Sequence, residues 1–430
     1  MPTDLFGLPV STTCPLALER YGRGVVGLLS WGRDALDHFH AAAEHDPGLA
    51  LAHAGAAVSL FLNEQFKEAR AAAQAARSAA TGATAWEQSH VEALALLVTE
   101  QTAPAEALMR EHLAAHPRDL AIFQRLYFIL FWRGAFPDML ALTEALLPAN
   151  RDGSFMLGLH AFALEEADRC DEARRLAEAA LERNPRDAWA VHALAHALYE
   201  EGASDLGLTA LPPAIHPCTH LGWFRNHLLW HLALMHLALG RYERARALSR
   251  RVFERAPSAI VGDLHDSISL LWRRELYGES VGDAWRPFAA IAAERLNRQG
   301  LLFHAVHLAM ALAGAGDWPT ATRQLGMLRE RAPEDPTGLV GELVFPLVEG
   351  LHAFAARDYA RAVERILPLR PRIVELGGSR AQRDVFHDTL LEACFRGERL
   401  DLAERLLAER LARRRDHYWS RRRTEPPARL

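Results

Sequence analysis

Two pairs of histidines, each pair four residues apart, are the residues of this chain best suited to chemistry. His192 and His196 lie in the segment 187–196, and His227 and His231 lie in the segment 226–234. Both segments have the pattern of a helix, and residues four apart share one helix face. Each helix therefore presents two imidazoles on one side of an otherwise apolar run.

Two kinds of chemistry fit these imidazoles, and the sequence leaves both open. In the first, the histidines are ligands of a divalent transition metal, and Asp263, Asp266 or Asp384 completes the ligand set. In the second, one histidine is a general base that an aspartate orients, while Arg383 binds an anionic group of the substrate. The catalytic candidates are His192, His196, His227, His231, Asp263, Asp266 and Asp384.

Other residues are candidates for binding a ligand beside these groups. Trp189 and Trp230 accompany the two histidine pairs, and His304 and His307 lie on a later segment. Tryptophans at helical spacing more often pack in a core, so core packing is the alternative to ligand binding for these two residues. Gly377-Gly378-Ser379 precedes a helical pattern. Because no strand precedes it, we favour Ser379 as a helix cap over a phosphate-binding loop.

A purely structural role for the histidines is the competing interpretation. The chain has 21 histidines among 430 residues, so pairs such as His112 and His116 arise by chance, here on a helix end that we expect to be exposed. A buried imidazole without a partner costs about 1–3 kcal/mol. Four clustered imidazoles would therefore need water, an aspartate, a metal or a substrate as partner.

The elements that position these residues are predicted to be helices. Strand signals are nearly absent, and alanine, leucine, glutamate and arginine recur at helical spacing between glycines and prolines. A frame of small residues followed by proline, typical of the second helix of a tetratricopeptide repeat, returns along the chain. Its copies are Ala35/Phe39/Ala42/Pro47, Ala173/Ala177/Ala180/Pro185, Ala245/Ser249/Val252/Pro257 and Ala321/Leu325/Leu328/Pro333. The pattern predicts an all-α, right-handed superhelix (solenoid) of tetratricopeptide-like helical hairpins, in which neighbours bury each hairpin.

Several segments resemble one family of such proteins. They are Asp187 to His192 with His196, His227 to Leu234, Leu270 to Arg273, and Val374 to Phe386. In order and spacing they are similar to the tetratricopeptide repeat protein 38 family over nearly the whole chain. The resemblance implies a soluble repeat protein and implies no particular reaction.

The resemblance also implies that the first helix of each hairpin lines a concave groove. In repeat phase, the two histidine pairs fall on the first helices of consecutive hairpins, which lie about 8–10 Å apart. Asp263 and Asp266 begin a later inner helix, and Asp384 begins the last clear one. Polar side chains of adjacent inner helices are therefore expected to converge on one pocket.

Composition limits the partners and the compartment. The net charge is −5, which gives no attraction to nucleic acid or to a membrane surface. Four scattered cysteines without a CxxC pair, together with the absence of a signal-like start, predict a cytoplasmic protein. We expect one repeat array over residues 1–412, followed by a basic, frayed tail over residues 413–430.

Two functions follow as hypotheses. The first is a protein that binds a peptide, protein or small molecule in its concave groove. Lys67 is the only lysine, which disfavours a carboxylate clamp built from repeated lysines. The alternative is an enzyme, a hydrolase or proton-transfer catalyst, with a histidine and aspartate pocket inside the superhelix and a divalent transition metal as its cofactor.

Overall fold

The computed structural model describes residues 1–298 and 301–423, and within these ranges the chain is helical. The only strand-like pairings there are two isolated bridges, Thr3 to Pro9 and Gly32 to Leu221. None of the described helices is both long enough and apolar enough to cross a membrane. The predicted all-α helical solenoid is thus confirmed.

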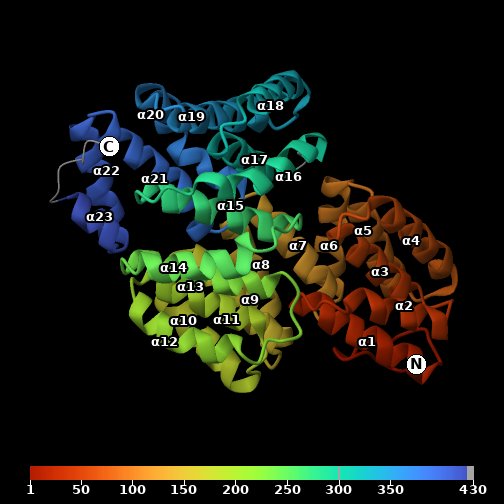
Figure 1. Cartoon of the computed structure of the whole chain (residues 1–430). Helices are drawn as coiled ribbons and strands as arrows, with labels where there is room; N and C mark the ends of the chain where they lie inside the picture. Colours follow the sequence, from red (N-terminus) through yellow and green to blue (C-terminus); the bar gives the residue numbers. More distant parts are fainter. Residues whose placement is uncertain (299–300, 424–430) are drawn as a thin grey trace.

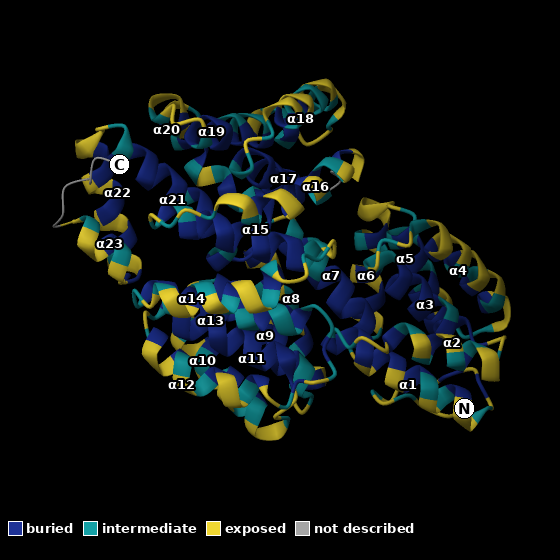
Figure 2. Ribbon diagram, in the orientation of Figure 1, coloured by how far each residue is buried: buried dark blue, intermediate teal, exposed yellow. Residues whose placement is uncertain are grey.

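Odd-numbered helices form an inner layer whose residues are mostly buried, which Figure 2 shows in dark blue. They are α1 (Pro15–Ser30), α3 (Ala50–Leu62), α5 (Ala85–Val98), α7 (Leu120–Trp132), α9 (Ser154–Glu166), α11 (Ala188–Glu200), α13 (Phe224–Ala238), α15 (Val261–Leu276), α17 (Leu302–Gly314), α19 (Phe345–Ala355) and α21 (Arg380–Arg396).

Even-numbered helices form the outer layer (Figure 1). They are α2 (Ala35–His45), α4 (Phe66–Ala79), α6 (Thr102–Ala115), α8 (Phe136–Asn150), α10 (Cys170–Arg183), α12 (Ser204–Ile215), α14 (Tyr242–Ser249), α16 (Trp285–Glu294), α18 (Trp318–Arg331), α20 (Tyr359–Ile366) and α22 (Leu400–Arg413). Short helical segments join or extend them, among them η7 (Leu367–Leu376) and α23 (His417–Arg422).

The small-residue frame explains how the two layers pack. In α10 the buried residues are Ala173, Ala177 and Ala180, each fully buried, whereas every residue of α11 is buried. Because the side chain of alanine is small, an outer helix with alanines on its contact face can lie close against its inner partner. Most other residues of α10 are polar, whereas Leu176 and Leu181 are partly buried and pack against the core.

The coil is closed enough for distant inner helices to touch. The ring of Trp132 at the end of α7 lies 5.8 Å from that of Phe303 in α17 and 6.4 Å from that of His265 in α15. The indole of Trp189 in α11 donates to the carbonyl of Leu29 at the end of α1, at 2.8 Å. Much of the inner surface is therefore packed against itself rather than open to solvent.

Gly134 is the closest backbone approach in this closure and gives a testable expectation. It has φ of +70°, and a Cβ built there would lie 1.9 Å from the carbonyl oxygen of Val374. We expect Gly134→Ala to lower the free energy of unfolding by at least about 2 kcal/mol, because both the conformation and a fixed carbonyl oppose it. Gly326, in the middle of α18 with open space around it, is the control. There the same change should stabilise by about 0.5–1 kcal/mol; equal effects at both sites in urea unfolding would contradict the closure.

The segment expected to be a frayed tail begins with ordered structure. Trp419 in α23 is fully buried, and Arg414 is 2% exposed. The guanidinium of Arg414 donates to Glu200 Oε1 at 2.6 Å and to Asp384 Oδ2 at 2.7 Å. Residues 413–423 are thus fastened to α11 and α21, and residues 424–430 lie outside the described range.

Candidate functional site

Helices α11 and α13 carry the two histidine pairs. The carboxylate of Asp187 caps α11 by accepting from the backbone N–H groups of Trp189 and Ala190, at 3.0 and 3.1 Å. Both helices belong to the inner layer and lie side by side. All four histidines are buried, with exposed fractions between 0% and 6%.

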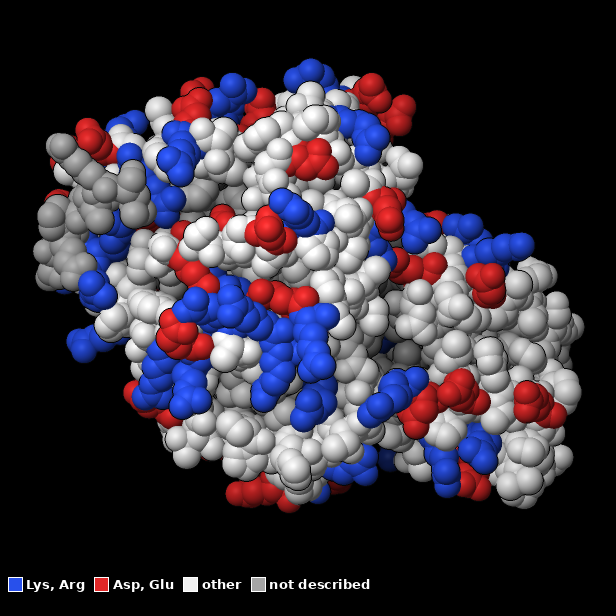
Figure 3. Space-filling model, viewed as in Figure 1, with Lys and Arg blue, Asp and Glu red and all other residues white. Residues whose placement is uncertain are grey.

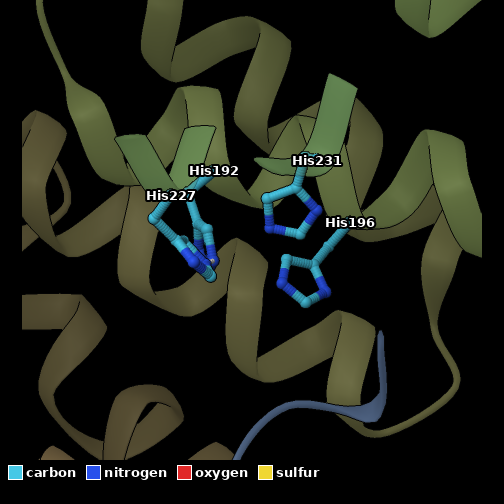
Figure 4. A group of neighbouring side chains, drawn as sticks. All are labelled: His192, His196, His227 and His231. Atoms are coloured by element: carbon cyan, nitrogen blue, oxygen red, sulfur yellow. Dashed lines mark hydrogen bonds between the residues drawn. The ribbon is translucent and has the colours of Figure 1, made fainter. Parts of the chain in front are cut away.

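The four imidazoles meet between the two helices (Figure 4). One ring nitrogen from each histidine can be chosen so that all four lie within 4.8 Å of one another. His192 Nε2 and His227 Nε2 are 3.0 Å apart and share a hydrogen bond. The ring centroids of His196 and His231 are 4.5 Å apart. Side chains up to 39 residues apart thus form one compact group.

Aromatic rings enclose this group. The rings of Trp230 and Phe224 both stack on that of His227, at 5.4 and 5.6 Å between centroids. Phe162 lies 4.7 Å from His192, and Trp189 meets the same ring edge-on at 5.5 Å. Trp189 and Trp230 therefore wall the cluster, and their indole N–H groups are used elsewhere, on Leu29 and Ser269.

Two buried carboxylates flank the cluster from neighbouring inner helices. Asp266 of α15 accepts a hydrogen bond from His227 Nδ1 through its Oδ2, at 2.8 Å. Glu165 of α9 places its Oε2 at 3.3 Å from His196 Nδ1, without the angles of a hydrogen bond. Sequence reasoning missed Glu165. Its signal was a charged pair, Glu165-Glu166, directly after the apolar run of α9.

Burial sets the charge of these groups. Desolvation lowers the pKa of His192 and of His231 well below the usual value, and lowers that of His196 to about 3. Burial, followed by the nearby Glu200 carboxylate, raises the pKa of Glu165 to about 8. At neutral pH the three rings are therefore neutral, and each has a nitrogen lone pair free to accept a proton or to bind a metal.

Many of the ring nitrogens have no hydrogen-bond partner within the described part of the chain. They are His192 Nδ1, both nitrogens of His196 and both nitrogens of His231. Each buried polar atom left in this way costs about 1–3 kcal/mol. So large a cost in one place indicates a site that another group completes.

The other predicted site residues lie apart from the four histidines. Asp263 accepts from Asn226 Nδ2 at 3.1 Å, and burial raises the pKa of this carboxyl to about 6. Burial alone would also raise the pKa of Asp384, but the guanidinium groups of Arg413 and Arg414 outweigh it and hold that pKa well below its usual value. Arg383 donates to Glu166 Oε2 at 3.0 Å and lies 4.6 Å from the ring of Phe136. In place of a substrate, Arg383 thus contacts Glu166 of the distant helix α9, and Asp384 contacts two arginines at the end of the following helix, α22.

His304 and His307 belong to a second imidazole group together with His265. His265 Nε2 and His304 Nδ1 are 3.0 Å apart, and His307 Nδ1 donates to the carbonyl of Phe303 at 2.8 Å. Desolvation lowers the pKa of His304 to about 4 and that of His307 to about 3. This group lies around α15 and α17, separate from the four histidines of α11 and α13.

Two further expectations can be compared with the structure. Ser379 caps α21 in a capping box with Gln382, as predicted. His112 is 2% exposed, so the expectation of an exposed helix end was wrong there. Its Nε2 lies 3.0 Å from Asp119 Oδ2, and His90 Nδ1 contacts the same oxygen at 2.6 Å. Asp119 caps the next inner helix, which draws both rings inwards.

Neither of two cavities that described residues form is lined by the four histidines. The larger, about 390 Å³, lies between α1, α3 and the segments around Trp223 and Ile260. The smaller, about 250 Å³, is lined by His387, Asp388 and arginines that include Arg410. The predicted pocket for a substrate beside the imidazoles is therefore not one of these cavities.

On the outer surface, arginines gather over α14 (Figure 3). Arg241, Arg244, Arg250 and Arg251 are exposed there. Acidic side chains partly neutralise the row: Arg241 Nη2 lies 2.6 Å from Asp205 Oδ1. A single exposed pair of this kind contributes little to stability.

Comparison with known proteins adds little to this description. No protein-family model matches the chain. A chain in the structure of Naa15/Naa10 bound to HypK-THB aligns with 14% identity over 91% of this chain and 67% of that chain, with a TM-score of 0.26. The crystal structure of the P58(IPK) TPR domain aligns with 15% identity over 80% of this chain and 98% of that chain, with a TM-score of 0.20. At these values neither structure identifies a function for this chain.

Proposed function

We propose that this protein is a helical-repeat binding protein that takes a small organic ligand in the cavity of about 390 Å³. The cavity is the observation that carries the proposal. Ligand sites are usually concave, apolar and a few hundred Å³ in volume, with a small number of polar groups. An extended peptide fits less well, because α7 reaches α15 and α17 across the interior.

The lining indicates the class of ligand. Trp31 and Trp223 meet edge-on at 5.2 Å, and Ile260 is 52% exposed at the rim. Of the charged lining residues, Glu64 is already paired with Arg295 at 2.8 Å, while Arg33 remains exposed and donates only to a backbone carbonyl. A flat, largely apolar molecule with an anionic group matches these surfaces.

The enzyme alternative has less support. The larger cavity is lined by no histidine, and its one carboxylate, Glu64, is held in an ion pair. A general base needs to lie within hydrogen-bond reach of the proton that it removes. The four imidazoles line neither cavity and are enclosed by aromatic rings, so binding without reaction is the function that we favour.

Membership of the tetratricopeptide repeat protein 38 family remains part of this proposal. The segments that carry the resemblance are central to the architecture. The two histidine segments belong to α11 and α13, and their imidazoles meet between these helices. The stretch that starts at Val374 packs against Gly134 and leads into α21. We also propose a cytoplasmic location, which suits four free cysteines.

An anionic fluorescent naphthalene, 1-anilinonaphthalene-8-sulfonate, is a suitable probe because it combines flat rings with a sulfonate. We expect one equivalent to bind to the folded protein, and Ile260→Glu to weaken binding by about tenfold or more, because it places negative charge at the rim. Leu206→Glu on α12, where the side chain is 48% exposed, is the control and should leave binding unchanged. Equal affinity in both variants, or binding to many weak sites, would contradict the proposal.

A further inference from the structure

We propose that His192, His196, His227 and His231 bind one divalent transition-metal ion, in a closed coordination shell of four imidazole nitrogens that joins α11 to α13. The site is distinct from the proposed ligand cavity and shares no lining residue with it. It gives the metal a structural role inside the repeat array.

The arrangement of nitrogen atoms supports the proposal first. A four-coordinate ion with metal–nitrogen distances of about 2.0–2.1 Å separates its ligand atoms by roughly 3.4 Å. Here one nitrogen from each of four rings already lies within 4.8 Å of the other three. Small rotations of the side chains close that difference. Each helix supplies two ligands at i and i+4, a spacing that places both on one face.

Ring nitrogens without hydrogen-bond partners are a second observation that supports the metal site. His231 and His196 have no hydrogen-bond partner on either nitrogen within the described residues, and His192 lacks one on Nδ1. Imidazole nitrogen is a common ligand of transition metals, and all three rings are buried. The rings are thus prepared for an ion and are poorly satisfied by the protein alone.

The flanking carboxylates support it third. Metal-bound histidines usually donate their second N–H to a carboxylate, which fixes the ring and its tautomer. Asp266 accepts from His227 Nδ1 at 2.8 Å, which leaves Nε2 to face the cluster. Glu165 lies 3.3 Å from His196 Nδ1 and is placed to do the same.

The ligand set indicates which metals fit. Four imidazoles suit zinc, copper, nickel or iron, whereas calcium and magnesium require oxygen ligands. Aromatic side chains surround the group, and neither of the two cavities is lined by it. A shell with four protein ligands and no open position is the arrangement of structural rather than catalytic zinc sites.

Two other groups of buried imidazoles are weaker candidates for a metal site, because some of their ring nitrogens already have partners in the protein. His90 and His112 both contact Asp119 Oδ2, so that group satisfies itself. In the group of His265, His304 and His307, one nitrogen of His307 is already used on the carbonyl of Phe303. This second group therefore provides a matched control of buried histidines.

The test uses the full chain without a histidine tag, stripped of metal with a chelator and titrated with Zn²⁺ against a chromophoric chelator. We expect one equivalent to bind and the melting temperature to rise with it. His231→Leu should weaken binding by at least about 100-fold, and Asp266→Asn by about 10–100-fold. His307→Leu, the control, should leave one equivalent bound with unchanged affinity.

Two results would overturn the proposal. One is a wild-type protein that binds Zn²⁺ no more tightly than about 10 μM. The other is a His231→Leu variant that keeps the full affinity. If His231→Leu does not fold, Co²⁺ added to the wild-type protein decides the question. Strong visible absorption of a tetrahedral Co²⁺ ion supports the site, and the weak absorption of an octahedral ion refutes it. Neither result depends on whether the naphthalene probe binds.

Discussion

At pH 5 the metal-free protein should be less stable than at pH 7.5 by more than about 3 kcal/mol. Eight buried histidines have pKa values that desolvation lowers, to about 4, about 3 or well below the usual value. They are His192, His196, His231, His265, His304, His307, His352 and His387. On unfolding, each ring regains its ordinary pKa near 6.5 and takes up a proton below it. The unfolded state therefore gains stability as the pH falls from about 6.5 towards 4.

Buried carboxyl groups oppose this effect but are fewer. Burial raises the pKa of Asp187, Asp263 and Asp416 to about 6 and that of Glu165 to about 8. Between about pH 6 and 4.5 these four hold protons in the folded state that the unfolded state releases. Burial also raises the pKa of Asp4, Glu166 and Glu275. The eight histidines still outnumber these seven carboxyl groups, and each surplus proton bound by the unfolded state corresponds to about 1.4 kcal/mol per pH unit.

Urea unfolding at a series of pH values measures the slope directly. His307→Leu removes one of the eight groups and should flatten the profile by about 1.4 kcal/mol per pH unit. His53→Asn, at a partly exposed ring that contacts the Pro47 carbonyl, should leave the profile unchanged. Stability that is constant or rises between pH 7.5 and 5 would contradict the burial of these rings.

Arg414→Ala should lower the free energy of unfolding by about 3–5 kcal/mol. The guanidinium of Arg414 is buried between the carboxylates of Glu200 and Asp384, at 2.6 and 2.7 Å, and lies 3.6 Å from the ring of Tyr199. Its loss leaves two buried carboxylates with only Arg413, whose Nε is 3.6 Å from Glu200. An isolated buried charge is costly because the protein interior solvates it poorly.

The adjacent Arg415 provides the matched control, since it is exposed. Arg415→Ala should change stability by less than about 0.5 kcal/mol. Similar losses for both arginines would show that residues 413–423 respond to total charge rather than to this buried contact. A loss below about 1 kcal/mol for Arg414→Ala would argue against the docking of the C-terminal segment.

Local packing could be predicted from the sequence because it depends on nearest neighbours. The frame of Ala173, Ala177 and Ala180 identified the contact face of α10, and all three are fully buried. The closure of the coil could not be predicted, because repeat phase places neighbouring hairpins and says nothing about contacts such as that of Trp132 with His265.

In the candidate site, too, contacts between neighbouring hairpins could be predicted and other contacts could not. Repeat phase placed the two histidine pairs on adjacent inner helices, and the structure brings their rings together. Glu165 could not be identified from the sequence, because its role depends on which side of α9 faces His196. Arg383 and Asp384 resembled ligand-binding groups, yet Arg383 pairs with Glu166 of the distant helix α9 and Asp384 pairs with Arg414 just after α22. Ion pairs between helices leave no periodic signal in the sequence.

X-ray absorption spectroscopy of the protein loaded with one equivalent of Zn²⁺ tests the four-imidazole site most directly. Four nitrogen neighbours at about 2.0–2.1 Å, with the outer-shell scattering of imidazole rings, are the expected result. A shell that contains sulfur, or six lighter neighbours at longer distances without ring scattering, would contradict the site formed by His192, His196, His227 and His231.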